Sequence, residues 1–555
     1  MSFKGIRGCN SRVSKEDQEF YDLRQRAAEY YRANSVPQNI EGVLNQMFLE
    51  KPDDIYGYLA NYFSQHSAKA VICRTEGKEV YDGNGQISAQ ADVYCIIRNE
   101  EKWVSSGAVP SHGELASGRT DPSGVAEESS AQSHALETAL SWINQPISTM
   151  LRGLNPSDQT TIDKILSDFF LARFLENEDE KRKESEAEEQ KSAESTPEPA
   201  PPPPPQPPTK DRKGADKALL RKKSVCMEQC LPPTAGDIHI PFPMVTVLSC
   251  GRMSPGKLHL LEEVIVLPAA GQRVREKIAM VLDLQKEVKR ILNSTSKTGT
   301  LVFPVTDGGA LLVGFDRVEQ PLDVLMEACA NLQLTPGTDV HFALSCAAHT
   351  LLDYSKGKYE IVAGTLKAPG ELIEVYESLI SRYPGICALI DPFRKEDLEQ
   401  WDKLSCALIG QPCCLIADAA FCSPPRLYGD KRLLPPGVAG VVLKHVNETT
   451  ITDLLCATSE GRDSTTILEQ SGTEWCDDYF VDLAVGLGVK FVKLGGLMGG
   501  VRLARYNRLM MLEEELTRQG ILGKLTRQGI LGSNQLELPL FGTSVSPGSE
   551  LLETE

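Results

Sequence analysis

Short apolar runs that each lead into a charged or polar residue recur through the second half of the chain. Residues 440–444 end in Lys444, and residues 490–493 end in Lys493. The other runs and the polar residues that follow them are 301–305 before Asp307, 340–344 before Ser345, 386–390 before Asp391, 413–417 before Asp418, and 466–468 before Glu469. Short, strand-length apolar runs separated by helix-length segments are typical of α/β folds with buried strands.

An opening pair of apolar runs, at residues 239–248 and 263–268, brings the total to about eight strands. This pattern predicts an α/β fold of the (β/α)8 barrel type, in which functional side chains gather at the carboxyl ends of the strands. An open, doubly wound sheet is the alternative interpretation of the same pattern.

Length and charge narrow the class of protein. The chain of 555 residues is too long to fold around a single hydrophobic core. At about 150 residues per domain, we expect roughly two to four domains. A formal net charge of −18 argues against a nucleic-acid partner. The sequence contains neither a membrane-spanning apolar run nor a signal peptide, so we expect a cytoplasmic protein. The fifteen cysteines lack the paired spacings of zinc sites. We expect most of them to be reduced thiols that pack in the core.

Two groups of apolar residues at helical spacing, within residues 21–64, predict a helical hairpin. Two helices of this size cannot bury both apolar faces alone, so we expect residues 1–66 to form a dimer. Residues 34–63 also resemble the dimerisation and docking modules of the regulatory-subunit and Dpy-30 type, whose dimers hold an amphipathic helix of a partner. A plain helical cap is the alternative.

The segment 67–174 mixes strand and helix patterns. Residues 69–97 alternate as strands do, around a turn at residues 82–85. Residues 103–124 are rich in Ser and Gly and predict a mobile loop, whereas residues 133–174 return to helical spacing. We therefore expect a small α+β domain here.

Two segments of the sequence are not expected to belong to a packed hydrophobic core. Charged residues fill 176–191 and prolines fill 197–208, which predicts a disordered insertion at residues 175–214. It is either a spacer or a ligand for SH3 or WW-type grooves. A duplicated octapeptide predicts a tail without chemistry of its own at residues 516–555.

Four stretches of the second half are specific enough to indicate a family: residues 258–268, 390–393, 478–487 and 502–515. They resemble enolase, the lyase that removes water from 2-phosphoglycerate to give phosphoenolpyruvate. Three others are similar to the capping domain of that family: residues 80–85, 108–111 and 158–163. The resemblance implies an enolase-type (β/α)8 barrel at residues 215–515, an N-terminal α+β capping domain at residues 67–174, and a homodimer.

Enolase chemistry takes a proton from an unactivated carbon acid, and two Mg²⁺ ions absorb the charge of the ene-diolate that forms. The resemblance therefore implies Mg²⁺ as cofactor. It also implies roles for the residues at the strand ends. These are Lys444 as the base, Asp307 as an acid shortened from Glu, Glu263 as a catalytic and substrate-binding carboxylate, Lys493 and Ser471 as substrate-binding residues, and Asp418 as a metal ligand.

Besides the shortened acid at Asp307, five positions depart from the pattern of the family. Ser345 and Ile390 stand where the family has its other two metal-binding carboxylates, and Mg²⁺ binds far more weakly to one aspartate and a hydroxyl than to three carboxylates. Glu469 and Gln470 replace a histidine and an arginine that hold the substrate's phosphate, and Ser254 replaces a loop histidine. Losing the arginine fork removes charge that attracts phosphate.

These observations leave two functions open. The first is an enolase-like lyase of glycolysis. The second is a weakly active or inactive enolase-fold scaffold, anchored in a flagellum or cilium through its N-terminal module and supporting sperm motility. Without metal, Lys444 and Lys493 would form ion pairs with Asp418 and Asp307. Asp391 could replace the missing ligand at 390 only if its strand slipped by one residue.

Overall fold

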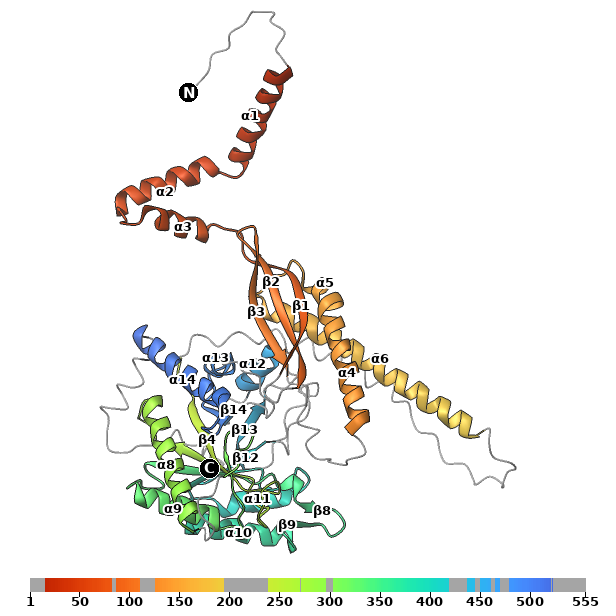
Figure 1. The fold of residues 1–555 in the computed structure, drawn as a ribbon, viewed down its shortest axis with the longest axis vertical. Helices are drawn as coiled ribbons and strands as arrows, with labels where there is room; N and C mark the ends of the chain where they lie inside the picture. Colours follow the sequence, from red (N-terminus) through yellow and green to blue (C-terminus); the bar gives the residue numbers. More distant parts are fainter. Residues whose placement is uncertain are drawn as a thin grey trace, which may run out of the picture. The chain divides into compact units, whose positions relative to one another are not determined.

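The computed structural model describes most of the chain (Figure 1). The described residues are 15–81, 86–109, 125–193, 238–269, 271–295, 303–418, 437–444, 450–460, 465–469, 479–520 and 522. They form two compact units, and the larger unit contains the barrel.

Three helices open the described chain: α1 (Lys15–Ala33), α2 (Val36–Glu50) and α3 (Ile55–Gln65). Helix α3 begins after Asp54, whose carboxylate accepts a hydrogen bond of 2.8 Å from the backbone N–H of Gly57 and so satisfies an otherwise unpaired donor of the first turn. Helices α2 and α3 lie where the helical spacing predicts them, and α1 is an additional helix.

A three-stranded sheet follows, with the order β1 (Val71–Tyr81), β2 (Ile87–Ile97) and β3 (Glu100–Val109). Strand β3 corrects the prediction of a loop from residue 103, while residues 110–124 lie outside the described residues. The reason is local: Arg98 and Asn99 have φ values of 55° and 65°, and two left-handed residues form the tight turn that returns a chain as a paired strand.

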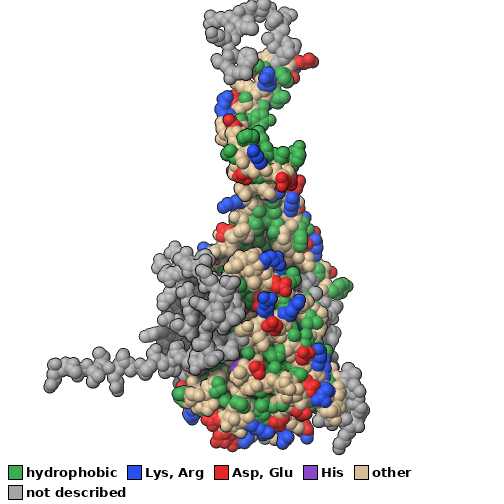
Figure 2. Space-filling model, turned by 90° about the vertical axis from the view of Figure 1, so that its left-hand side faces the viewer, with side chains coloured by type: hydrophobic (Ala, Val, Ile, Leu, Met, Phe, Trp, Pro, Cys, Tyr) green, Lys and Arg blue, Asp and Glu red, His purple; other side chains and the backbone are tan. Residues whose placement is uncertain are grey.

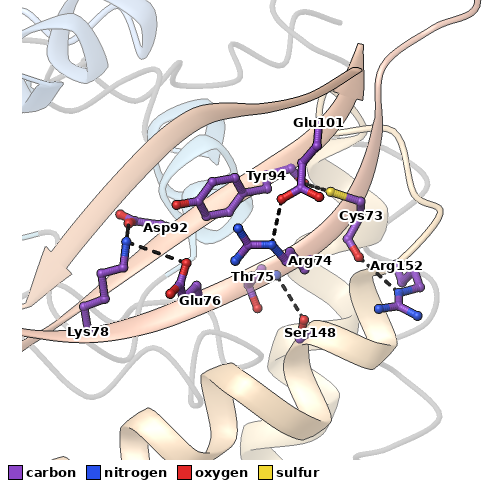
Figure 3. Close-up of polar contacts among 10 residues, drawn as sticks. All are labelled: Cys73, Arg74, Thr75, Glu76, Lys78, Asp92, Tyr94, Glu101, Ser148 and Arg152. Carbon is purple, nitrogen blue, oxygen red and sulfur yellow. Dashed lines mark hydrogen bonds and ion pairs between the residues drawn. The ribbon is translucent and has the colours of Figure 1, made fainter. Parts of the chain in front are cut away.

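Polar contacts brace this sheet (Figure 3). The guanidinium of Arg74 lies 3.6 Å from the ring centre of Tyr94, and its Nε lies 2.8 Å from Glu101 Oε1. Farther along β1, the Nζ of Lys78 lies 2.7 Å from Asp92 Oδ2. Each contact pairs side chains of different strands, and such cross-strand pairs help to fix the pairing of the strands.

The helical part of this region consists of α4 (Val125–Trp142), a π-helical turn η2 (Ile143–Ile147), α5 (Ser148–Leu151) and α6 (Gln159–Ala193). Helix α6 corrects the prediction of disorder for residues 175–193. That stretch is rich in Glu, Lys and Ala, which are strong helix formers and place opposite charges one turn apart. Residues 194–214 of the predicted insertion lie outside the described residues.

Eight strands close into a barrel. They are β4 (Phe242–Ser249), β5 (Glu263–Pro268), β7 (Val340–Ser345), β11 (Ile386–Ile390), β12 (Cys414–Ala417), β13 (Val438–Lys444), β14 (Thr465–Glu469) and β15 (Phe491–Gly495), and β15 pairs with β4 to complete the circle. The barrel prediction is confirmed and the open sheet is excluded. Strand β5 is antiparallel to both of its neighbours, whereas the other barrel pairs are parallel.

The run 301–305 is not a barrel strand, which corrects one strand of the prediction. Within its described part, Val305 forms a single bridge to Leu311, and β6 (Leu311–Leu312) pairs with β4 instead. The backbone turns between these residues at Gly308 and Gly309, and this turn carries Asp307. Asp307 therefore projects from a short loop and not from a strand end.

Apolar side chains fill the interior of the barrel, and helices and short strands lie outside it. Its interior is filled by apolar side chains that include Met244, Ile265, Ile416, Ile467 and Phe491, all at most 1% exposed. The outer elements in Figure 1 are α8 (Val274–Thr295), α9 (Gln320–Asn331), β8 (Leu352–Asp353), β9 (Lys358–Val362), β10 (Thr365–Lys367), α10 (Pro369–Arg382), α11 (Leu398–Ala407), α12 (Ile451–Glu460), α13 (Tyr479–Gly486) and α14 (Gly500–Arg518).

All ten cysteines among the described residues are free thiols, as expected for reduced cysteines, and six of them are buried in the core, whereas Cys406 is exposed. No helix in the described part of the chain has the length and apolar character needed to cross a membrane.

Candidate active site

Three charged residues form a row at the carboxyl ends of three neighbouring strands. Strand β13 ends at Lys444, β14 ends at Glu469, and Lys493 lies near the end of β15. Lys444 is the register partner of Glu469, and Glu469 is the register partner of Lys493. Because the three strands are parallel and in register, alternation places these side chains on the same face of the sheet and at the same level of the barrel.

These side chains meet two further carboxylates. The Nζ of Lys493 lies 2.6 Å from Oε1 of Glu469 and 2.6 Å from Oε2 of Glu263. The Nζ of Lys444 lies 3.4 Å from Oδ1 of Asp418 and 3.7 Å from Oε2 of Glu469. The structure thus brings together four of the residues that the sequence predicts for the site, with Glu469 between the two lysines.

The cluster is poorly exposed, so its charges interact strongly. The Lys493 side chain is 8% exposed and that of Glu469 is 13% exposed. Burial alone would raise the pKa of Glu469, but the ammonium groups of Lys493 and Lys444 outweigh it and lower that pKa. Burial would lower the pKa of Lys493, and Glu263 and Glu469 together raise it well above its usual value. Both members of this pair are therefore charged near neutral pH.

Asp418 behaves differently from Glu469. Burial raises its pKa to about 8, and repulsion by Glu469 adds to this rise, while Lys444 opposes it. Its backbone N–H donates a hydrogen bond of 2.7 Å to Oδ1 of Asp391. The Asp391 carboxylate thus links the ends of β11 and β12. Its Oδ1 is already engaged by this hydrogen bond.

The residues present do not fit the magnesium site of the family. Ser345 and Ile390, which the resemblance places at the positions of two metal-binding carboxylates, are register partners on β7 and β11. The Ile390 side chain has no oxygen and is only 2% exposed, within the apolar interior. Asp391 leaves strand geometry with φ of 46° and bonds Asp418. The described residues contain no group of three or more His, Cys, Asp or Glu that could hold a metal.

Asp307 forms no ion pair with the cluster of lysines and carboxylates within the described part of the chain. Residue 307 is exposed, and its backbone carbonyl accepts a hydrogen bond of 3.4 Å from Arg502. The loop that carries it packs directly on the end of β15, where a Cβ on Gly496 would clash with the carbonyl of Gly309. The expected pairing of Lys493 with Asp307 is wrong, since Lys493 binds Glu263 and Glu469.

Other predicted positions have ordinary roles or cannot be placed. The hydroxyl of Ser254 donates a hydrogen bond of 3.2 Å to the carbonyl of Cys250, which stabilises the local turn. Ser471, predicted to bind substrate, and its neighbour Gln470 lie outside the described residues.

Arg502 is a residue near the site whose position the sequence does not predict. This residue is 3% exposed, and it donates to the carbonyls of Leu494 and Asp307. Burial and its neighbour Arg505 lower its pKa to about 10, while Glu263 and Glu469 oppose that shift. Arg502 thus links β15 to the Asp307 loop and adds positive charge behind the cluster. A helix pattern alone does not reveal which face of α14 touches a strand end.

This arrangement defines a class of protein: a closed barrel with an antiparallel second strand, whose mouth holds two buried lysines among carboxylates. Sequence comparison agrees with it. The sequence model of the family described as "Enolase, C-terminal TIM barrel domain" matches residues 237–528. The chain is 47% identical to "Enolase 4" of Danio rerio, over 94% of this chain and 96% of that protein.

More distant relatives give the same result. "Enolase 4" of Xenopus laevis is 38% identical, over 92% of this chain and 95% of that protein. "Enolase" of Thermococcus kodakarensis is 31% identical over 280 residues, which are 50% of this chain and 63% of that protein. The chain belongs to the enolase family.

Proposed function

We propose that the barrel catalyses the dehydration of 2-phosphoglycerate to phosphoenolpyruvate. The observation that supports this most is that the Nζ atoms of Lys444 and Lys493 approach the same carboxylate, Glu469, at 3.7 Å and 2.6 Å. The reaction begins with loss of a proton from the carbon next to the substrate's carboxylate. Removing it requires a base beside that carbon, and a positive charge near the carboxylate stabilises the negative charge that develops there. Two lysines on neighbouring strands can supply both.

In this proposal Lys444 first gives up its own proton and then, as the neutral amine, takes the proton from C2, while the ammonium of Lys493 offsets the charge that develops on the substrate's carboxylate. The bond from C3 to its hydroxyl then breaks, and the hydroxyl leaves as water with a proton from a carboxyl group. Glu263 and Asp307 are the candidates for this end of the substrate. No step is assigned to Mg²⁺, because the donor set does not fit it. We therefore expect slower turnover than in a relative with three metal-binding carboxylates.

Purified full-length protein tests this proposal directly. Phosphoenolpyruvate formation from 2-phosphoglycerate is measured with and without Mg²⁺, for the wild type, for Lys444→Ala, and for the control Glu287→Gln on the outer helix α8. We expect formation by the wild type and the control, and none by Lys444→Ala. A wild type that forms no more product than Lys444→Ala would remove the proposal.

A second candidate function is supported by the N-terminal helices. Large apolar side chains are exposed there, with Phe48 at 73%, Leu49 at 79% and Tyr56 at 84%. Figure 2 shows hydrophobic side chains on the surface of this helical segment, in the narrow part of the view just below the uppermost grey atoms. A groove of about 680 Å³ lies between residues of α1 and α2, lined by Tyr31, Val36, Pro37, Ile40, Glu41, Leu44 and Asn45. Such apolar exposure on three short helices indicates a binding surface.

We propose that this surface forms a homodimer and docks an amphipathic helix of a partner, so that the protein serves as a scaffold. The setting we propose is a flagellum or cilium, as in sperm. Deletion of residues 1–66 tests this proposal through the molar mass in solution and the localisation in flagellated cells. We expect loss of dimers formed by this module and loss of localisation. A deletion that changes neither contradicts the scaffold.

A further inference from the structure

Glu469 holds a negative charge between two buried ammonium groups. Its two oxygens face different lysines: Oε1 lies 2.6 Å from Lys493 and Oε2 lies 3.7 Å from Lys444. The side chains of Lys493 and Lys444 are only 8% and 17% exposed. Two lysines fixed in this way at the mouth of a barrel form an anion-binding position, and here the anion belongs to the chain itself.

An anion tethered to the chain competes strongly with an anion from solution. Glu469 is held by the register of β14 with both flanking strands, so it reaches the lysines without the entropy cost that a soluble ligand bears. Its carboxylate also repels any second anion that approaches the same ammonium groups. Glu263 does not have the same effect, because it contacts Lys493 but makes no ion pair with Lys444 in the described residues.

We infer that Glu469 is a specificity-determining residue that occupies the anion position of this site, so that soluble phosphate and phosphorylated acids bind weakly as long as its charge is present. The inference deepens the proposed function where the ligand is 2-phosphoglycerate. It makes a separate statement about inorganic phosphate, which undergoes no reaction and reports binding alone.

Titration calorimetry with inorganic phosphate tests the inference on the full-length protein. The variants are Glu469→Gln, which removes the charge and keeps the shape, and Glu469→Gln with Lys493→Met, which also removes one ammonium. Glu287→Gln is the matched control, because it makes the same change in an ion pair with Arg290 on α8. We expect Glu469→Gln to bind phosphate at least about tenfold more tightly than the wild type, as one charge-assisted contact warrants.

The double variant, the control and the wild type each have an expected phosphate affinity. The double variant is expected to lose the gained affinity, and the control to match the wild type. Equal phosphate affinity in Glu469→Gln and the wild type overturns the inference. If Glu469→Gln does not fold, Glu469→Ser removes the same charge and is compared in the same way. A wild type that binds phosphate with Kd below about 0.1 mM overturns the inference without any variant.

The same proteins separate this inference from the proposed function. If Glu469→Gln binds phosphate more tightly but neither protein forms phosphoenolpyruvate, the inference stands and the proposed reaction fails. If the wild type turns over 2-phosphoglycerate and Glu469→Gln shows no gain in phosphate affinity, the reaction stands and the inference fails. If both hold, Glu469→Gln also shows a lower KM for 2-phosphoglycerate.

Discussion

The Nζ of Lys493 lies 2.6 Å from Oε1 of Glu469, and the two residues are register partners on adjacent parallel strands. Their side chains are 8% and 13% exposed, so the pair is shielded from water on most sides. A buried pair differs from a surface pair in one respect: when one partner is removed, the other remains as an uncompensated charge in a poorly solvated place.

Lys493→Met should therefore destabilise the fold strongly. Glu469 and Glu263 both lose their shared ammonium, and we expect the free energy of unfolding at neutral pH to fall by about 3–5 kcal/mol. Urea denaturation measures this change. Adding Glu469→Gln to Lys493→Met should restore part of the loss, because one of the two carboxylates that lost this ammonium is then neutral.

The control for this prediction is Lys286→Met on α8. Lys286 lies 2.8 Å from Asp283, but the two side chains are 74% and 60% exposed. Removing one partner of such a pair should change the free energy of unfolding by no more than about 1 kcal/mol. Similar losses for the two lysine variants would show that the barrel-mouth pair behaves as a surface pair.

A second prediction concerns Mg²⁺. Ser345 and Ile390 are register partners, so carboxylates placed on both would lie about one strand spacing of 4.8 Å apart, beside Asp418. We expect the double variant Ser345→Asp with Ile390→Glu to bind Mg²⁺, with a thermal midpoint that rises as MgCl₂ is added. The wild type should show no such rise.

The control for the metal is NaCl at matched ionic strength, since salt alone screens the repulsion among the new carboxylates. A wild type stabilised by millimolar MgCl₂ but not by NaCl would contradict the conclusion that its donor set does not fit the ion. A double variant that folds but responds equally to both salts would contradict the geometric argument.

How far the sequence predicts this structure depends on whether a feature is local. Lys444 and Lys493 are predictable as strand-end residues because each follows an apolar run of strand length. The direction of β5 is not predictable in this way, because an apolar run looks the same whether its strand runs parallel or antiparallel. Strand β3 was missed since its Ser and Gly content is typical of loops.

The site itself depends on register, which a single sequence does not contain. Asp307 follows an apolar run, yet it lies in a turn with Gly308 and Gly309, and Lys493 pairs with Glu263 and Glu469 instead of with its carboxylate. Glu469 enters that cluster because β14 is in step with both of its neighbours. The choice of Glu469 and not Asp307 as the partner of Lys493 follows from that spatial arrangement.

A third prediction concerns the contact between α6 and α12. Oδ2 of Asp163 accepts hydrogen bonds from the backbone N–H and the hydroxyl of Thr452, at 2.9 Å and 2.7 Å. Thr452 lies in the first turn of α12, where backbone donors lack partners within the helix. Asp163→Ala leaves two buried donors unsatisfied, and we expect a loss of about 1–3 kcal/mol in the free energy of unfolding.

Urea denaturation and amide hydrogen exchange measure the effect of Asp163→Ala. Exchange should accelerate in the first turn of α12 and not in the barrel strands. Asp168→Ala, at an exposed position of the same helix, is the control and should change stability little. Unchanged exchange at residues 451–454 in Asp163→Ala would show that Asp163 does not hold this helix end.

The last prediction concerns Lys277 and pH. Lys277 is 6% exposed, its Nζ lies 3.9 Å from the ring centre of Phe242, and the carboxylate of Glu513 attracts it. Burial lowers its pKa from 10.5 to about 8, and Glu513 opposes part of that shift. Between these pH values the unfolded chain holds more protons than the folded one, so the stability of the wild type should rise with pH across that window.

Lys277→Met removes the buried charge and keeps the length of the side chain. The shift corresponds to about 3 kcal/mol against the charged form, and attraction to the ring offsets about 1 kcal/mol of it. At pH 7 the variant should therefore be more stable than the wild type by about 2 kcal/mol. The difference should shrink as the pH rises from about 8 to 10.5, since the wild-type amine becomes neutral there. Urea denaturation of both proteins at pH 7 and across the range from about 8 to 10.5 measures this difference in stability. A variant less stable than the wild type at pH 7 would show that the ammonium contact with Phe242 and Glu513 stabilises the fold.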